Sequence, residues 1–182
     1  MRLFFKEFFK LNIKEHEELL NIRNKEYVKN NMKTNSIIEI EEHLSWVNNL
    51  QKDKSNVYYA VYKEDCIVGA IYITDINKME STSYWGLYFE KNVNPLISSV
   101  SAILIIEKIF QEFNIKKLYA EVKKENVVAY KFNETLGFKK EKILDKNFYR
   151  LSISVDDWEN NKNNRIIKTV KKRLNRIEYK FA

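Results

Sequence analysis

The chain has 182 residues, 45% of them hydrophobic, and a formal net charge of +7 at pH 7. This size and apolar content predict one domain with its own core, and three glycines, one proline and one cysteine leave no linker and no internal disulfide. Charges interrupt the apolar N-terminal segment and no run approaches about 18 apolar residues, which excludes a signal peptide and a membrane span, so we expect a cytoplasmic protein.

The first half of the chain predicts a strand, two helices and a run of three strands. β-Branched and aromatic residues dominate each strand, and only a short turn at Asp65 and Cys66 separates the first two strands of the run, which indicates a hairpin. The run therefore predicts an antiparallel meander. The expected elements are a strand over 2–8, helices over 14–24 and 39–51, and strands over 57–64, 67–76 and 82–90.

The second half begins with a loop that holds the single proline, Pro95, and continues with the longest apolar helix. The expected elements are a helix over 98–113, a strand over 116–124, a helix over 126–136, and strands over 138–145 and 147–155. Together the two halves predict an α/β (α+β) domain of three layers, in which helices flank a mixed central sheet of about seven strands.

Basic residues concentrate in the C-terminal segment 157–182, which has eight Lys or Arg against three Asp or Glu. Apolar residues recur there at spacings of three and four, which predicts one basic amphipathic helix. They are Ile166, Ile167, Val170, Leu174 and Ile177. We expect residues 1–155 to form the main domain and residues 156–182 to be a helix appended to that domain. The helix is expected to pack on its own domain or on a second subunit, whereas nucleic acid or an anionic membrane is the less favoured partner.

The order of these elements and the segment "EVKKENVVAYKFNETLGFKKE" (121–141) resemble the GNAT (Gcn5-related N-acetyltransferase) family. In that family acetyl-coenzyme A (acetyl-CoA) lies in a V-shaped opening between the fourth and fifth strands. The resemblance implies the same fold here and an acetyl-CoA-dependent N-acetyltransferase that needs no metal.

Three further segments narrow this resemblance. "IRNKEYVKNNM" (22–32), "EEHLSWVNNL" (41–50) and "YWGLY" (84–88) are similar to bacterial enzymes that acetylate the 4-amino group of a UDP-linked amino-dideoxysugar in pseudaminic acid synthesis. The resemblance covers roughly residues 1–155 and leaves the basic tail unmatched. It implies a UDP-amino sugar as acceptor and a product that feeds a nonulosonic acid for surface glycans such as flagellin.

The phosphates of acetyl-CoA are expected at a helix N-terminus, where amides are free and the helix dipole is positive. We predict this cradle at the start of the helix expected from Ser98. Members of the family usually have glycines in this turn, whereas this chain has serines. The alternative to a phosphate site is therefore that Ser98 is only the N-cap of a core helix. By resemblance, the residues that bind acetyl-CoA are Leu87, Tyr88, Ser98, Ser99, Val100, Ser101, Ala102 and Asn126.

Gly86 lies inside a predicted strand, where glycine often marks a bulge or a close backbone approach. In this fold a bulge would open the sheet and turn the amide of Leu87 or Tyr88 toward the thioester oxygen, with a plain packing glycine as the alternative. Asn126 is expected to cap the helix of 126–136 and also to contact the pantetheine arm.

Three residues are predicted to be catalytic. By resemblance Glu121 is the expected general base, and strand alternation turns it away from the apolar side chains Leu118, Ala120 and Val122, although a solvated strand carboxylate is the alternative. Asn133 stands where related enzymes have a tyrosine that protonates the departing thiolate, and an amide can only donate a hydrogen bond. Tyr130, one turn earlier on the same helix, is the alternative acid.

The acceptor site is predicted from the resemblance and from helix spacing. His43 and Trp46 are three residues apart, beside the stripe expected to face the core, and are expected to look into a cleft. Arg23 or Lys33 is expected to meet the diphosphate. The predicted substrate residues are Arg23, Asn24, Met32, Lys33, His43, Trp46 and Tyr84.

Two other functions stay open at this point. A protein N-terminal acetyltransferase of the ribosomal-protein type would use the same fold with a peptide-shaped cleft. A catalytically silent binding module would explain the missing glycines and the missing tyrosine together. A homo-oligomer is compatible with each of these functions.

Overall fold

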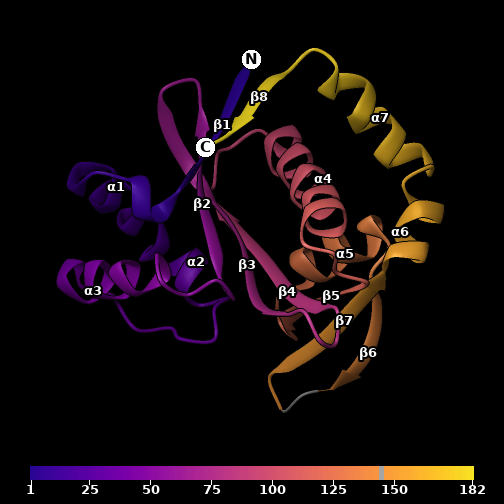
Figure 1. Ribbon diagram of the computed structural model, residues 1–182, viewed down its shortest axis with the longest axis horizontal. Coiled ribbons are helices and arrows are strands. Elements are labelled where there is room, and N and C mark those ends of the chain that lie inside the picture. The colour runs from indigo at the N-terminus through magenta and orange to yellow at the C-terminus, as the bar shows by residue number, and fades with distance from the viewer. Residues whose placement is uncertain (144–145) are drawn as a thin grey trace.

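The computed structural model describes residues 1–143 and 146–182 (Figure 1). The described residues form one mixed sheet of eight strands in the order β6-β7-β5-β4-β3-β2-β1-β8. The strands are β1 (Arg2–Glu7), β2 (Val57–Lys63), β3 (Cys66–Asn77), β4 (Thr82–Phe89), β5 (Lys117–Lys123), β6 (Lys139–Ile143), β7 (Phe148–Ser154) and β8 (Glu178–Phe181). The end of the strand predicted over 138–145 lies outside the described residues.

Helices cover both faces of this sheet, which confirms the predicted three-layer α/β fold. Figure 1 shows α1 to α3 on one side and α4 and α5 on the other. The helices are a 3-10 turn η1 (Phe8–Lys10), α1 (Ile13–Arg23), α2 (Glu26–Lys29), α3 (Ile40–Leu50), α4 (Pro95–Glu112), α5 (Val127–Leu136), α6 (Val155–Asn161) and α7 (Arg165–Leu174). The short η1 and α2 were not predicted, because three or four residues show no helical periodicity.

Local signals set several helix ends. Asn12 and Glu15 form a capping box at the start of α1, and the Asn126 side chain accepts a hydrogen bond from the Ala129 amide at the start of α5. α5 ends at Gly137, whose φ of 99° lies in the left-handed region that favours glycine. The predicted N-cap at Asn126 is therefore confirmed.

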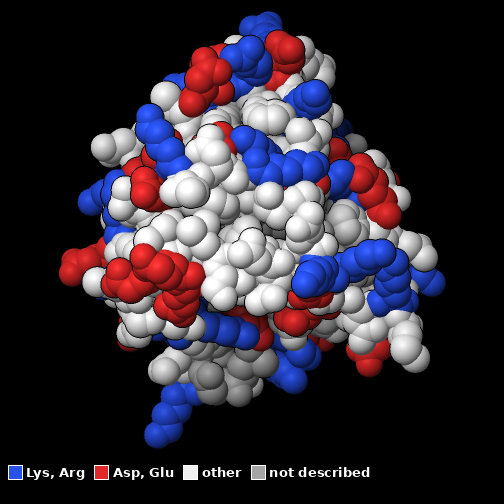
Figure 2. All heavy atoms as spheres, turned by 60° about the vertical axis from the view of Figure 1, so that its left-hand side comes forward, with Lys and Arg blue, Asp and Glu red and all other residues white. Residues whose placement is uncertain are grey.

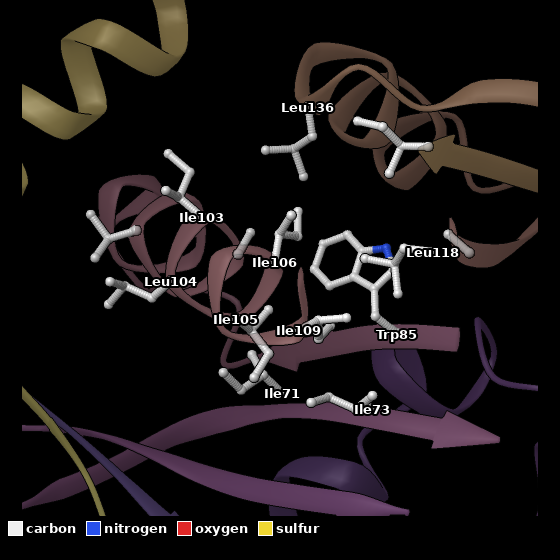
Figure 3. Close-up of a cluster of buried hydrophobic side chains, with 14 of the residues drawn as sticks. Ile71, Ile73, Trp85, Ile103, Leu104, Ile105, Ile106, Ile109, Leu118 and Leu136 are labelled. Carbon is white, nitrogen blue, oxygen red and sulfur yellow. The ribbon is translucent and has the colours of Figure 1, made fainter. Parts of the chain in front are cut away.

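The main core lies between the sheet and α4. Nearly every residue on the sheet side of α4 is apolar, and Figure 3 shows Ile105 and Ile109 packed above Ile71 and Ile73 of the sheet. A smaller cluster around Phe8 and Leu19 fills the opposite face, beneath α1 and α3. The alternation in β5 also follows the prediction, with Leu118, Ala120 and Val122 buried.

The single helix predicted over 157–182 is wrong. The segment forms α6, α7 and β8, and β8 pairs in parallel with β1 at the edge of the sheet. Trp158, Ile167 and Ile177 join the main core, and Phe181 stacks on Phe5 with ring centroids 4.4 Å apart. Helical spacing could not reveal the strand, because β8 is only four residues long and gains its partner through tertiary pairing.

None of the helices in the described part of the chain is both long and apolar enough for a membrane span.

Candidate active site

The fourth and fifth strands separate within the sheet. β4 and β5 pair in parallel from Thr82–Lys117 to Tyr84–Tyr119, and no further pair follows among the described residues, although both strands continue. Past Tyr84, the backbone groups that β4 points toward β5 therefore have no strand partner. Leu87 and Tyr88 lie on the β4 side of this opening.

The bulge predicted at Gly86 is wrong. β4 pairs with β3 on both sides of the Tyr72–Gly86 pair without a register shift. A glycine is required at position 86 for a different reason. A Cβ there would lie 2.4 Å from Cζ of Tyr72. The Tyr72 ring lies over the glycine, so the close approach is by a side chain. The opening between β4 and β5 forms without a bulge at Gly86.

An aromatic row crosses the sheet on the side of α1 to α3. The rings of Tyr58 and Tyr72 stack with centroids 5.1 Å apart, and Trp46 from α3 meets Tyr58 edge-on at 4.8 Å. Burial raises the pKa of both tyrosines, so both phenols stay neutral. Trp46 is 37% exposed. Figure 2 shows this side of the molecule, with uncharged atoms in the middle and charged residues around them.

Tyr58 and Tyr72 were not predicted as site residues. A two-residue turn at Glu64 and Asp65 would place Tyr58 opposite Ile71. A register shift between Val61 and Tyr62 moves the pairing by one residue and brings Tyr58 opposite Tyr72. The shift decides which side chains line this face, and no local sequence signal gives its position.

Glu121 lies at the mouth of the opening, two residues beyond the last β4–β5 pair. Its carboxylate forms an ion pair with Lys33, and its side chain is 15% exposed. On the other side of β5, Glu121 pairs in register with Arg150 of β7. The structure thus brings Glu121 and Lys33 together, and the Lys33 ammonium is not directed at a separate diphosphate site.

Arg23 and Met32 approach the same place from the segment around α2. Arg23 Nη2 donates to the Thr34 carbonyl at 2.8 Å, whereas its Nη1 is buried and has no hydrogen-bond partner within the described residues. The Tyr72 hydroxyl lies 3.9 Å from Met32 Sδ. Burial is the largest influence on the pKa of Tyr72 and raises it. The charge of Arg23 lowers this pKa and the charge of Glu121 raises it, so both charges act on the Tyr72 ring. A buried guanidinium nitrogen without a partner is costly unless a ligand satisfies it.

Arg150 is a further site candidate that the sequence did not indicate. Its guanidinium lies 4.7 Å from the Tyr119 ring centroid, and its Nη1 is 3.4 Å from the Tyr84 hydroxyl. Glu141 accepts a hydrogen bond from Nε at 2.7 Å. The rings of Tyr84 and Tyr119 lie 5.1 Å apart. Arg150 therefore fixes Tyr84, a predicted substrate residue, at the last pair before the strands separate.

Two predicted substrate residues, His43 and Asn24, form hydrogen bonds within the protein. His43 is only 6% exposed, and its Nε2 shares a hydrogen bond of 3.0 Å with Nδ1 of His16, so the prediction that it looks into a cleft is wrong. Asn24 exchanges two hydrogen bonds with the Ile38 backbone, at 2.8 and 3.0 Å, and thereby closes the loop before α3. The interval of three residues between His43 and Trp46 did not show which of them would face inward.

The helix predicted to begin at Ser98 begins at Pro95. Asn94 is the N-cap, its side chain accepts a hydrogen bond from the Leu96 amide, and Pro95 has no N–H. The hydroxyls of Ser98 and Ser99 both donate to the Pro95 carbonyl, at 3.0 and 2.8 Å. The prediction of an N-cap or of free amides at Ser98 is therefore wrong, because the helix begins one turn earlier and the Ile97 amide donates to the Asn94 carbonyl at 2.8 Å.

The other members of the predicted cradle lie deeper in α4. They are Val100, Ser101 and Ala102, all buried. Their amides fall in the second turn of the helix, where each N–H has a carbonyl partner one turn back. In the first turn of α4, the Leu96 and Ile97 amides are both bonded to Asn94, so α4 offers no amide of its first two turns to a phosphate without a change at Asn94.

The two candidate acids on α5 differ in their surroundings. Asn133 is 6% exposed and its Nδ2 donates to the Ala129 carbonyl at 2.9 Å. Tyr130 is partly exposed and packs edge-on against Tyr149. Desolvation and the neighbouring Glu134 raise the pKa of Tyr130, so its phenol carries a proton at neutral pH.

Unpartnered buried polar atoms occur mainly on β4, α4 and α5. Five buried side-chain polar atoms of the described residues have no hydrogen-bond partner, and four of them belong to these elements. These four are Ser83 Oγ, Trp85 Nε1, Ser101 Oγ and Asn133 Oδ1. Buried polar groups are rarely left unpaired, but Ser83 and Ser101 are fully buried and Trp85 packs in the main core, so these atoms do not mark a ligand site. No group of three or more potential metal ligands occurs in the part of the chain that the structure describes.

Comparison with known proteins decides the family. Residues 11–156 match the family described as "Acetyltransferase (GNAT) domain". The chain belongs to the GNAT acetyltransferase family. It is 31% identical over 157 residues to "Acetyltransferase PseH" of Campylobacter jejuni strain 81-176, which covers 84% of this chain and 94% of that protein.

Solved GNAT structures agree with this result. The crystal structure of C. jejuni PseH in complex with acetyl coenzyme A matches at a TM-score of 0.69 and 26% identity, over 84% of this chain and 99% of that one. A Vibrio cholerae spermidine N-acetyltransferase in complex with CoA and spermine matches at a TM-score of 0.76. Its identity is only 16%, over 86% of this chain and 98% of that one, so it shows the fold alone. The predicted GNAT fold and acetyltransferase class are confirmed.

The buried histidine pair predicts a pH-dependent stability for this GNAT protein. Burial lowers the pKa of His43 to about 4, with a further contribution from His16. Between pH 6.5 and 4 the unfolded chain therefore binds a proton that the folded chain does not, so stability falls as pH falls. Between pH 7 and pH 5, we expect wild type to lose about 2 kcal/mol more than His43→Gln in urea unfolding. Equal losses would contradict this assignment, and an exposed-site variant, Lys172→Ala, serves as the control.

The contact between Gly86 and Tyr72 predicts a coupled pair of substitutions. Gly86→Ala places a methyl group against the Tyr72 ring and should cost about 1–3 kcal/mol of stability. In a Tyr72→Ala background the same change should cost much less, because the clashing ring is gone. A double-mutant cycle by denaturant unfolding measures the coupling, and additive effects would contradict it.

Proposed function

We propose that this protein transfers the acetyl group of acetyl-CoA to the 4-amino group of a UDP-linked amino-dideoxysugar, in pseudaminic acid synthesis or a related nonulosonic acid pathway. The similarity to PseH over most of both chains carries the proposal. Acetyl-CoA as co-substrate is supported by the crystal structure of C. jejuni PseH, which is a complex with acetyl coenzyme A. We place the reaction in the cytoplasm, where acetyl-CoA and nucleotide sugars are both present.

The face around Tyr72 supports a sugar nucleotide as acceptor. Trp46 and Tyr58 offer aromatic surface for a base or for the methyl group of a deoxysugar. The unpartnered Nη1 of Arg23 offers a charged donor to a diphosphate or a sugar oxygen. Glu121 stands between this face and the opening between β4 and β5.

Each step of the transfer has a residue to perform it. Glu121 takes a proton from the sugar ammonium, directly or through a water molecule, because only the neutral amine attacks a thioester. The amide of Leu87 or Tyr88 that faces away from β3 is the donor for the oxyanion that forms on the carbonyl. Tyr130 returns a proton to the thiolate, while Asn133, whose Nδ2 bonds to its own helix, stays a structural neighbour.

The fit to acetyl-CoA differs between its two ends. The thioester end has the opening between β4 and β5. The pyrophosphate end has the first turn of α4, where proline removes one amide and Asn94 accepts from two others, those of Leu96 and Ile97. We expect fewer backbone contacts to phosphate than a glycine turn gives, and hence a weaker hold on the pyrophosphate.

An assay with purified protein tests the proposal. Release of coenzyme A thiol is followed with acetyl-CoA and either UDP-4-amino-4,6-dideoxy-N-acetylaltrosamine or a panel of N-terminal peptides. We expect turnover with the amino sugar and only background with the peptides. Turnover with peptides alone would replace the proposal by an N-terminal acetyltransferase, and no turnover with any acceptor would refute it.

A further inference from the structure

Lys33 reaches the carboxylate that we assign as general base. Its Nζ forms an ion pair with Glu121 Oε2. The Glu121 side chain is 15% exposed, whereas that of Lys33 is 68% exposed. The carboxylate is therefore fixed within the sheet, and a mobile primary amine reaches it from the solvent side.

Contacts on both sides of Lys33 hold its backbone against the sheet. Residues 30–34 form neither helix nor strand, yet β5, β3 and α1 each bind this segment. The contacts are Lys123 Nζ to the Asn30 carbonyl at 2.8 Å, the Tyr72 hydroxyl to Met32 Sδ at 3.9 Å, and Arg23 Nη2 to the Thr34 carbonyl at 2.8 Å. With both neighbours anchored, the Lys33 amine stays within reach of Glu121 even when the ion pair opens. Such tethering gives the amine a high effective concentration at the site.

Lys33 therefore has the position that the acceptor amine must take. The proposed reaction requires an ammonium beside Glu121, at the mouth of the opening between β4 and β5. Lys33 brings an alkylammonium to that carboxylate. Its chain is flexible and mostly solvent-exposed, so its amine can move from the carboxylate toward a thioester in the opening.

We propose that Lys33 is a site of self-acetylation by this active site when no amino sugar is bound. The inference rests on the proposed function, because it uses the same thioester and the same base. Glu121 accepts a proton from the Lys33 ammonium, and Nζ attacks the thioester carbonyl. A C–N bond forms and the C–S bond breaks, the nitrogen gives its second proton to the departing sulfur, and Glu121 releases the first proton to water.

Self-acetylation has a consequence for the site itself. Acetyl-Lys33 has no charge and no longer forms the ion pair with Glu121. The amino sugar and Lys33 compete for one carboxylate, so bound acceptor protects Lys33. The fraction of acetylated Lys33 would therefore increase with the time that the protein spends with acetyl-CoA in the absence of its acceptor.

Mass spectrometry of the full-length protein tests the inference. The protein is incubated with acetyl-CoA alone, and acetylation is located and timed by intact mass and peptide mapping. We expect Lys33 to react at least about 10-fold faster than the exposed Lys172, because base catalysis typically contributes more than that. Glu121→Gln should remove this advantage, and saturating UDP-amino sugar should suppress it. Lys29→Arg, at the end of α2, is the matched control and should leave the Lys33 rate unchanged.

The outcomes separate the two proposals. Lys33 acetylation no faster than that of Lys172, or unchanged in Glu121→Gln, overturns self-acetylation. If the amino sugar is acetylated in the same preparation, the proposed function stands without it. If neither the sugar nor Lys33 is acetylated, both proposals fail. Rapid Lys33 acetylation with no transfer to the sugar supports self-acetylation and rejects the proposed acceptor.

Discussion

Glu121→Gln is expected to lower kcat for the amino sugar about 10²–10⁴-fold and to leave the Kd for acetyl-CoA nearly unchanged. The amide keeps the size of the carboxylate but cannot accept a proton from the acceptor ammonium. It also ends the ion pair with Lys33, which involves no residue of α4. Steady-state kinetics and calorimetric titration with acetyl-CoA measure the two quantities.

A neighbouring carboxylate provides the control. Glu125 is exposed on the turn after β5, so Glu125→Gln changes the charge equally and should keep wild-type kcat. Wild-type kcat in Glu121→Gln would remove Glu121 from the role of base. A parallel loss of acetyl-CoA affinity would instead indicate a damaged opening between β4 and β5.

Trp158→Ala is expected to lower the free energy of unfolding by about 3–5 kcal/mol, and the Tm by about 10 °C. Trp158 is 1% exposed and belongs to the main core, although it lies beyond the residues that match the GNAT family. Its replacement leaves a cavity beneath α6, which links β7 to α7. Denaturant unfolding and a thermal scan measure the loss.

A second tryptophan gives the matched comparison for stability. Trp46→Ala deletes the same side chain at a site that is 37% exposed, so its cost should be clearly smaller. Equal costs would mean that the C-terminal segment adds nothing special to the core. The expected difference would show that residues after 155 stabilise the acetyltransferase domain itself, beyond adding a charged surface.

The C-terminal segment shows where periodicity misleads. The apolar residues of 157–182 fit one helical stripe, and two of them, Ile167 and Ile177, are indeed buried. The stripe is nevertheless divided between α7 and the approach to β8, whose hydrogen bonds go to β1 at the other end of the chain. A pairing between residues 2–5 and 178–181 leaves no trace in local spacing.

The sequence by itself determined the family, the order of elements up to residue 155 apart from the short η1 and α2, the alternation that turns Glu121 away from the core, and the cap at Asn126. These depend on residues within one turn or one strand, where side-chain direction follows from backbone geometry. The tertiary structure alone decided which side chains from distant segments contact one another. A one-residue register shift brought Tyr58 to Tyr72, burial paired His43 with His16, and an anchored loop brought Lys33 to Glu121. Such partners are far apart in the chain, and their meeting depends on strand register and helix packing, which no single segment encodes.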